Sequence, residues 1–166
     1  MNNIRTPCND SVFLLLVLIA PLFSIGFHFI VPSNFVAHPT PSNPYHLFII
    51  LILYPLLEEL TFRGLIQTLI LDHRIFRKDL FSISLANLIA SLLFVLAHYL
   101  ARGDPIVATV FVPSLVFGYL VERYRRLYPS IIMHSLYNTI HFILSYHILK
   151  FIKDSQSIGT GYQWRF

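Results

Sequence analysis

The chain has 166 residues, of which 55% are hydrophobic and 12% are charged, and its formal net charge is +4. A soluble domain carries about 25% charged residues, so this composition excludes an ordinary soluble surface and favours a helical membrane protein. The small positive charge indicates membrane orientation rather than a nucleic-acid partner. The single cysteine, Cys8, excludes an internal disulfide and a cysteine-based zinc site.

Apolar runs of helical length follow one another along the chain, each bounded by a polar or proline-containing segment. A helix needs about 20 apolar residues to cross a bilayer. The second run is about 40 Å long at 1.5 Å per residue, so it could tilt or divide at Pro55, whereas Pro113 should kink the fourth. The pattern predicts an all-α, polytopic transmembrane bundle of about five to six spans. The runs are residues 12–31, 45–71, 80–100, 106–121 and 130–149.

The domain organisation follows from these runs. We expect an N-terminal transmembrane helix and loop over residues 1–44, a core over 45–150, and a polar C-terminal tail over 151–166. Basic residues concentrate in the second and fourth loops, which predicts that these loops and the N-terminus are cytoplasmic. Five spans would then place the tail outside, although it carries Lys150, Lys153 and Arg165, so the side of the C-terminus stays open.

The stretch EELTFRG, residues 58–64, places three charges inside the second run. Each charge at mid-bilayer costs about 2.5–3.5 kcal/mol. Glu59 and Arg63 are four residues apart, so they share a helix face and can form an ion pair. Glu58 points about 100° away from Glu59 and has no obvious partner on its own helix. A simple ion pair near the membrane interface is the alternative interpretation.

Polar side chains also occur in the third and fifth runs, at His98 and at His134 and Asn138. Unpaired polar groups in hydrocarbon cost several kcal/mol, so we expect these residues to converge inside the bundle. A carboxylate beside imidazoles can take a proton from water, and His and Asn side chains can donate to an oxyanion. This set suits peptide-bond hydrolysis. Alternatively, Glu58, His98 and His134 could hold a zinc ion with water as fourth ligand, and the spacing does not decide between them.

Three short motifs occur in order, each in its own apolar run: EELTFR fits E-E-x-x-x-R, FVLAH fits F-x-x-x-H, and HSLYN fits H-x-x-x-N. Together they resemble the CAAX-protease and bacteriocin-processing family of intramembrane proteases, also called the Abi family. The resemblance covers roughly residues 45–147 and identifies residues 45–150 as a protease core. It implies an all-helical membrane fold whose active site opens to the cytoplasmic side.

The resemblance also implies roles for the motif residues. Glu58 would activate water with help from His98, and His134 and Asn138 would stabilise the oxyanion. The supporting residues would be Glu59, Arg63 and Phe94.

By the same resemblance, the protein would be a glutamate protease that requires no cofactor, with a zinc-dependent version as the alternative. Its partners would be the lipid bilayer and a membrane-anchored peptide or protein, such as a C-terminal anchor, a sorting tail or a small peptide precursor. The expected location is a prokaryotic cytoplasmic membrane. Many family members have additional spans, so the substrate class stays open. Two other classes fit the same polar residues: a transporter with a proton relay and a non-catalytic membrane immunity protein.

Two further residues are predicted to serve helix packing. Asn87 in the third run should form a hydrogen bond between helices, and Gly118 in the fourth should allow close helix approach.

Overall fold

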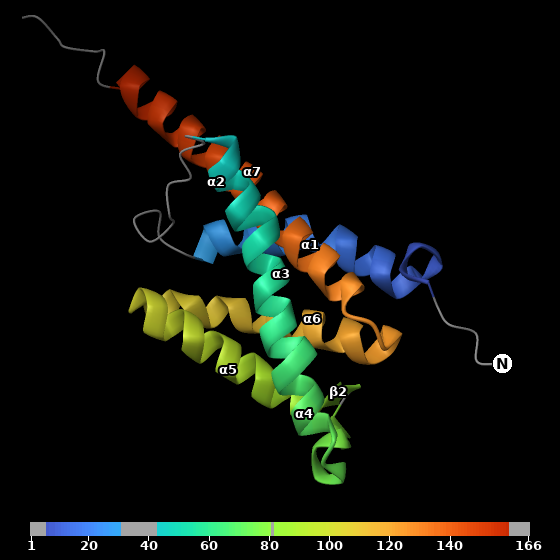
Figure 1. Ribbon diagram of the computed structural model, residues 1–166. Helices are drawn as coiled ribbons and strands as arrows, with labels where there is room; N and C mark the ends of the chain where they lie inside the picture. Colours follow the sequence, from blue (N-terminus) through green and yellow to red (C-terminus); the bar gives the residue numbers. More distant parts are fainter. Residues whose placement is uncertain (1–5, 31–42, 81, 160–166) are drawn as a thin grey trace, which may run out of the picture.

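The structure is a computed structural model that describes residues 6–30, 43–80 and 82–159 (Figure 1). Nearly all of these residues are helical, which confirms the predicted all-α class. The exception is a hairpin of two short antiparallel strands, β1 (Asp79–Leu80) and β2 (Ile83–Ser84), which pairs Asp79 with Ser84.

The first apolar run forms α1 (Ser11–Ile30), which follows a short 3₁₀ turn, η1 (Pro7–Asn9). The Asp10 carboxylate accepts a hydrogen bond from the backbone N–H of Val12 at 3.0 Å, and so satisfies one of the free donors at the start of α1. The predicted loop that follows α1 falls largely on residues 31–42, which lie outside the described residues.

The second run is one helical column, here called the α3 column, with two π-helical stretches in it. Its segments are α2 (Pro44–Phe48), η3 (Ile49–Leu53), α3 (Tyr54–Glu59), η4 (Leu60–Gln67) and α4 (Thr68–Leu71). The stretches η3 and η4 are the π-helical ones. Pro55 is among the first residues of α3 and does not divide the run.

The third run starts later than predicted. Leu80, Ile83 and Ser84 belong to the hairpin strands. The helix α5 (Leu85–Arg102) begins where the Ser84 side chain accepts from the backbone N–H of Asn87 at 3.0 Å. The helix ends at Gly103, whose φ of 69° is the left-handed conformation that glycine adopts without strain.

The fourth run is a 3₁₀ helix, η6 (Pro105–Val110), followed by α6 (Phe111–Tyr124). Pro113 is the third residue of α6. The change from 3₁₀ to α-helix precedes it. The kink expected at Pro113 stays a prediction.

The fifth run forms α7 (Tyr128–Gly159), which continues through much of the predicted tail. Residues 151–158 contain neither proline nor glycine, so nothing in them stops helix propagation before Gly159. The remaining tail residues, 160–166, are not described.

Two helical stretches in the described parts of the chain are long and apolar enough to cross a membrane by length and composition: α5, and η6 with α6. The apolar part of α1 is shorter, and the α3 column consists of short segments. The prediction of five to six spans is therefore supported for two of them and stays a prediction for the others.

Apolar side chains cover the outside of the bundle and polar ones fill part of its inside. Leu18, Leu22 and Leu100 are exposed, whereas Glu59 and Arg63 are fully buried. Where α1, α6 and α7 meet, the core is apolar. Where the α3 column meets α5 and α6, the buried residues are polar. This distribution suits a surrounding of lipid rather than water. The apolar core consists of Phe13, Ala20, Phe117, Leu120, Tyr124, Met133 and Tyr137.

Candidate active site

Three helices bring an acid and two imidazoles together. Glu58 lies on α3, His98 near the end of α5 and His134 in the second turn of α7. One carboxylate oxygen of Glu58 is 3.5 Å from Nε2 of His134, and the other is 4.0 Å from Nε2 of His98. The convergence expected from polar residues in separate apolar runs is therefore present for these three side chains.

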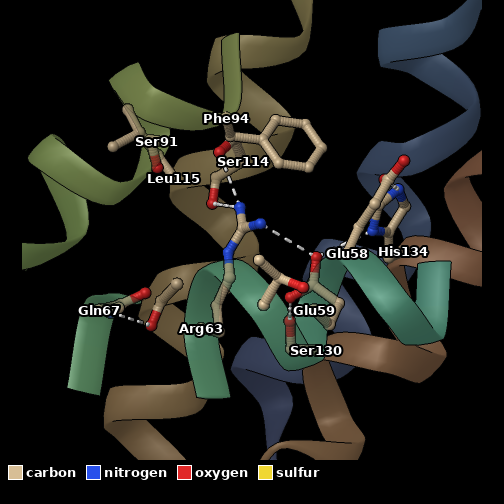
Figure 2. Close-up of polar contacts among 12 residues, drawn as sticks. Glu58, Glu59, Arg63, Gln67, Ser91, Phe94, Ser114, Leu115, Ser130 and His134 are labelled. Carbon is tan, nitrogen blue, oxygen red and sulfur yellow. Dashed lines mark hydrogen bonds and ion pairs between the residues drawn. The ribbon is translucent and has the colours of Figure 1, made fainter. Parts of the chain in front are cut away.

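Glu59 is surrounded by polar partners and is fully buried, with 0% of its side chain exposed. Its Oε1 is 3.2 Å from the guanidinium of Arg63 and accepts a hydrogen bond from Nδ1 of His134 at 2.8 Å. Its Oε2 accepts a hydrogen bond from the hydroxyl of Ser130. The ion pair expected from the i, i+4 spacing is thus one of three contacts that hold this carboxylate (Figure 2).

Arg63 connects the carboxylates to α5 and α6. Its NH2 group donates to the backbone carbonyl of Ser114 at 2.8 Å and lies 2.7 Å from the Ser114 hydroxyl. The guanidinium carbon lies 4.8 Å from the ring centre of Phe94 and 5.7 Å from that of Phe117. Planar stacking and directed hydrogen bonds both use the shape of the guanidinium, which a lysine lacks.

Hydrogen bonds to Nδ1 set the state of both imidazoles, because a carbonyl or carboxylate oxygen can only accept. Nδ1 of His98 is 3.0 Å from the carbonyl of Phe94, and Nδ1 of His134 is 2.8 Å from Glu59. In the neutral rings Nε2 is then unprotonated, and in both residues it is Nε2 that faces Glu58. Phe117 stacks on His134 with ring centres 4.6 Å apart and fixes its plane.

Asn138 is one turn beyond His134 on α7, but its observed contact differs from the one expected. Its side-chain amide donates to the carbonyl of Ile50 in η3 at 3.4 Å. No hydrogen bond within the described residues joins Asn138 to Glu58, His98 or His134. One of its two amide protons is used in this way, and the second is available to another acceptor.

The π-helical geometry of η4 helps to align the polar side chains. Its i→i+5 hydrogen bonds place more residues in each turn than the 3.6 of an α-helix. Residues four apart, such as Glu59, Arg63 and Gln67, therefore lie nearly in line along the column, and all three are buried. About one turn after Arg63, the side-chain amide of Gln67 donates to the carbonyl of Gly118 at 3.2 Å and to the carboxylate of Glu122 at 2.6 Å. The predicted pair is part of a longer buried polar row.

Sequence reasoning did not select Ser114, Ser130 or Gln67 as parts of the site. Ser130 is four residues before His134, and Gln67 is four residues after Arg63, so each shares a helix face with a selected residue. That spacing was the available signal for these two. Ser114 had no comparable signal, because its contact with Arg63 joins two helices.

The donor types of Glu58, His98 and His134 suit zinc. However, no group of three or more His, Cys, Asp or Glu side chains among the described residues is arranged to hold a metal ion. The side chains therefore do not fit a metal centre in this arrangement, and we derive no catalytic step through one.

Comparison with known proteins gives one family. The model of the Rce1-like family, described as type II CAAX prenyl endopeptidase Rce1-like, matches residues 40–140, which include all the candidate site residues. No curated protein and no solved structure matches the chain significantly.

Proposed function

Because the chain belongs to the Rce1-like family of CAAX-type membrane proteases, we propose that it is an intramembrane endopeptidase in which Glu58 activates the attacking water. The substrate is a membrane-anchored peptide or protein, cleaved near the membrane interface. A C-terminal anchor, a sorting tail or a small peptide precursor suits this role.

The observation that carries the proposal is the contrast between the two adjacent carboxylates. Glu59 is fully buried and its oxygens contact Arg63, Ser130 and His134. The side chain of Glu58 is 30% exposed, and its neighbours are the Nε2 atoms of His134 and His98 at 3.5 and 4.0 Å. A general base must reach water and have an oxygen free to accept a proton. Glu58 meets both requirements, and Glu59 meets neither.

In the first proposed step, a water molecule beside Glu58 loses a proton to the carboxylate as its oxygen bonds to the carbon of the scissile carbonyl. Nε2 of His98 accepts a hydrogen bond from the second water proton and orients the water, since its Nδ1–H is held by Phe94. In the second step, Glu58 returns its proton to the amide nitrogen as the C–N bond breaks. The carboxylate is regenerated, and the products are an acid and an amine.

The oxyanion of the first step needs hydrogen-bond donors. His134 can donate through Nε2 only as an imidazolium, because its Nδ1–H is directed to Glu59. The donors that we propose are His134 and the second amide proton of Asn138.

The test is cleavage of a co-expressed tail-anchored substrate by the wild type and by Glu58→Gln, measured by the mass of the substrate. Glutamine keeps the shape of the side chain but cannot take the proton, so cleavage should fall by at least about 10²–10⁴-fold. Asp72→Asn, which alters an exposed carboxyl after α4, is the matched control and should cleave normally. Normal cleavage by Glu58→Gln would overturn the assignment. A non-catalytic immunity protein would keep its function in cells with this substitution.

A zinc-dependent version of the same protease is the alternative that the sequence left open, although the described side chains are not arranged to hold a metal ion. The two versions differ in metal content. We expect chelator-washed protein that still cleaves substrate to contain no stoichiometric zinc in elemental analysis. One zinc per active chain would establish the metal-dependent version instead.

A further inference from the structure

A cavity of about 850 Å³ has Arg63 among its lining residues. Its walls come from the lower part of the α3 column, the hairpin, the end of α6 and the loop before α7. Glu58, His98 and His134 are not among its lining residues, so it is a separate site from the proposed catalytic one. The volume lies within the range of small-molecule sites, about 300–1,000 Å³. We call it the basic cavity.

The charges around the basic cavity are predominantly positive. Five arginines and two carboxylates line it: Arg63, Arg77, Arg123, Arg125, Arg126, Asp72 and Glu122. Arg63 is paired with Glu59, and Arg123 with Asp10. The side chains of Arg125 and Arg126 are exposed, and their guanidinium groups form no hydrogen bond or ion pair with the described residues. Their charges are therefore available to an anionic ligand.

The backbone of the cavity wall is unusual at two positions. In the described parts of the chain, Ser82 and Arg125 are the non-glycine residues with positive φ, at 66° and 54°, and both line this cavity. Arg125 occupies the left-handed position that ends α6, where glycine is preferred. Residues held in such conformations concentrate at functional sites. Arginine is sterically less favourable than glycine at this position, and a role of its side chain in ligand binding would explain its presence.

The other lining residues indicate which anion fits. Leu71, Val121 and Leu127 give the cavity an apolar wall. Leu65 and Leu69, which follow the lining residues Gly64 and Thr68 in the sequence, are 56% and 57% exposed. The second and fourth loops of the sequence, in which arginine and lysine concentrate, are expected at the membrane surface. A ligand with a phosphate group and acyl chains matches basic and apolar walls together.

We propose that the basic cavity binds the phosphate headgroup of an anionic phospholipid, with Arg125 and Arg126 as its ligands and the acyl chains along Leu65 and Leu69. This site does not depend on the proposed function, since none of the proposed catalytic side chains lines it. Bound lipid would hold the loop before α7, and hence the start of the helix that carries His134, against the α3 column.

The test measures lipid retention by the full chain in detergent, using native mass spectrometry with an equimolar mixture of phosphatidylglycerol and phosphatidylcholine. The wild type should retain phosphatidylglycerol preferentially. The double variant Arg125→Gln/Arg126→Gln should bind it about 30-fold more weakly, which corresponds to about 1 kcal/mol for each arginine. Arg102→Gln, at the opposite end of α5 and outside the cavity, is the matched control and should behave as the wild type.

Two further arms separate lipid from other anions. Arg125→Lys/Arg126→Lys keeps both charges and should retain most of the binding, which shows that the loss in the glutamine variant is not misfolding. Inorganic phosphate should fail to raise the melting temperature as phosphatidylglycerol does. Equal stabilisation by phosphate alone, or unchanged lipid retention in the glutamine variant, would overturn the proposal. If the glutamine variant retains lipid as the wild type does but has a higher KM for substrates with a free C-terminal carboxylate, the proposal is also overturned. The cavity would then be assigned to the peptide substrate.

Discussion

At the scale of single residues, Glu58 and Glu59 show how neighbours in sequence acquire different chemistry. They lie on different sides of α3, so one is exposed beside two imidazoles and the other is enclosed by three polar partners. A buried carboxylate that keeps all its partners is stable in low dielectric, whereas removal of one partner exposes the desolvation cost of the charge.

Ser130 is the partner whose removal tests this argument most directly. Ser130→Ala removes a hydroxyl donor from Glu59 and leaves Arg63 and His134 in place. We expect a loss of about 1–3 kcal/mol in the free energy of unfolding and slower cleavage, because Glu59 also orients His134. Thermal unfolding in detergent and a cleavage assay measure the two effects. Ser135→Ala on the same helix is the control, and an equal effect in both variants would refute the specific role of Ser130.

At the scale of secondary-structure elements, the contact of the α3 column with α5 and α6 depends on close approach at Gly118. Asn87 on α5 donates to the carbonyl of Leu115 at 2.9 Å, which confirms the predicted hydrogen bond between helices. A Cβ atom at Gly118 would lie 2.0 Å from Oδ1 of Asn87 and 2.8 Å from Oε1 of Gln67. The packing role predicted for Gly118 is thus required by the polar groups of both neighbouring helices.

Gly118→Ala should therefore destabilise the bundle by about 1–3 kcal/mol, the usual cost of adding a methyl group to a filled interior. The measurement is the melting temperature in detergent. Gly26→Ala on α1 is the matched control, because a Cβ there meets nothing within 4 Å and alanine favours a helix. It should leave the melting temperature unchanged or raise it. An unaffected Gly118→Ala variant would contradict the close approach.

At the scale of the whole molecule, an ion pair joins the start of α1 to the end of α6. Arg123 donates from Nε to Asp10 at 2.8 Å and from NH2 at 3.0 Å, so the contact is bidentate. The hydrogen bond from Arg123 holds the pKa of Asp10 down, from 3.8 to about 2, with help from the backbone N–H of Val12. The two residues are far apart in sequence, so this contact ties the first helix to the family core.

Protonation of Asp10 at low pH should weaken its ion pair with Arg123. Its pKa is lower in the folded chain than in the unfolded one, so the pair stabilises the fold above about pH 4. That stabilisation is lost as the pH falls from about 4 to 2. Melting temperatures of the wild type and Asp10→Asn should differ by about 2–4 °C near neutrality, for a contribution of about 1 kcal/mol, and should converge near pH 2. Asp72→Asn serves as the control, and a constant difference across this range would contradict the pair.

Much of the site followed from local patterns, and the part that did not was set by contacts between helices. The i, i+4 rule selected Glu59 with Arg63 correctly, because both partners lie on one helix. Ser114 had no such rule, because it meets Arg63 only through the packing of α6 on the α3 column. Helix ends were also predicted imperfectly. The start of α5 depends on the Ser84 cap and on a hairpin that apolar periodicity does not distinguish from a helix.

The amino-acid sequence alone determines the all-helical class, the scarcity of surface charge and the succession of the three motifs. The reason is that the length of apolar runs and the spacing of residues are local properties. Only the tertiary structure decided which of two adjacent carboxylates faces the imidazoles and which is enclosed. The reason is physical: α7 brings Ser130 and His134 onto Glu59, and this saturates one acid and leaves Glu58 exposed beside His98 and His134. The basic cavity is likewise a product of packing, since its arginines come from two parts of the chain that are far apart in the sequence, residues 63–77 and 123–126.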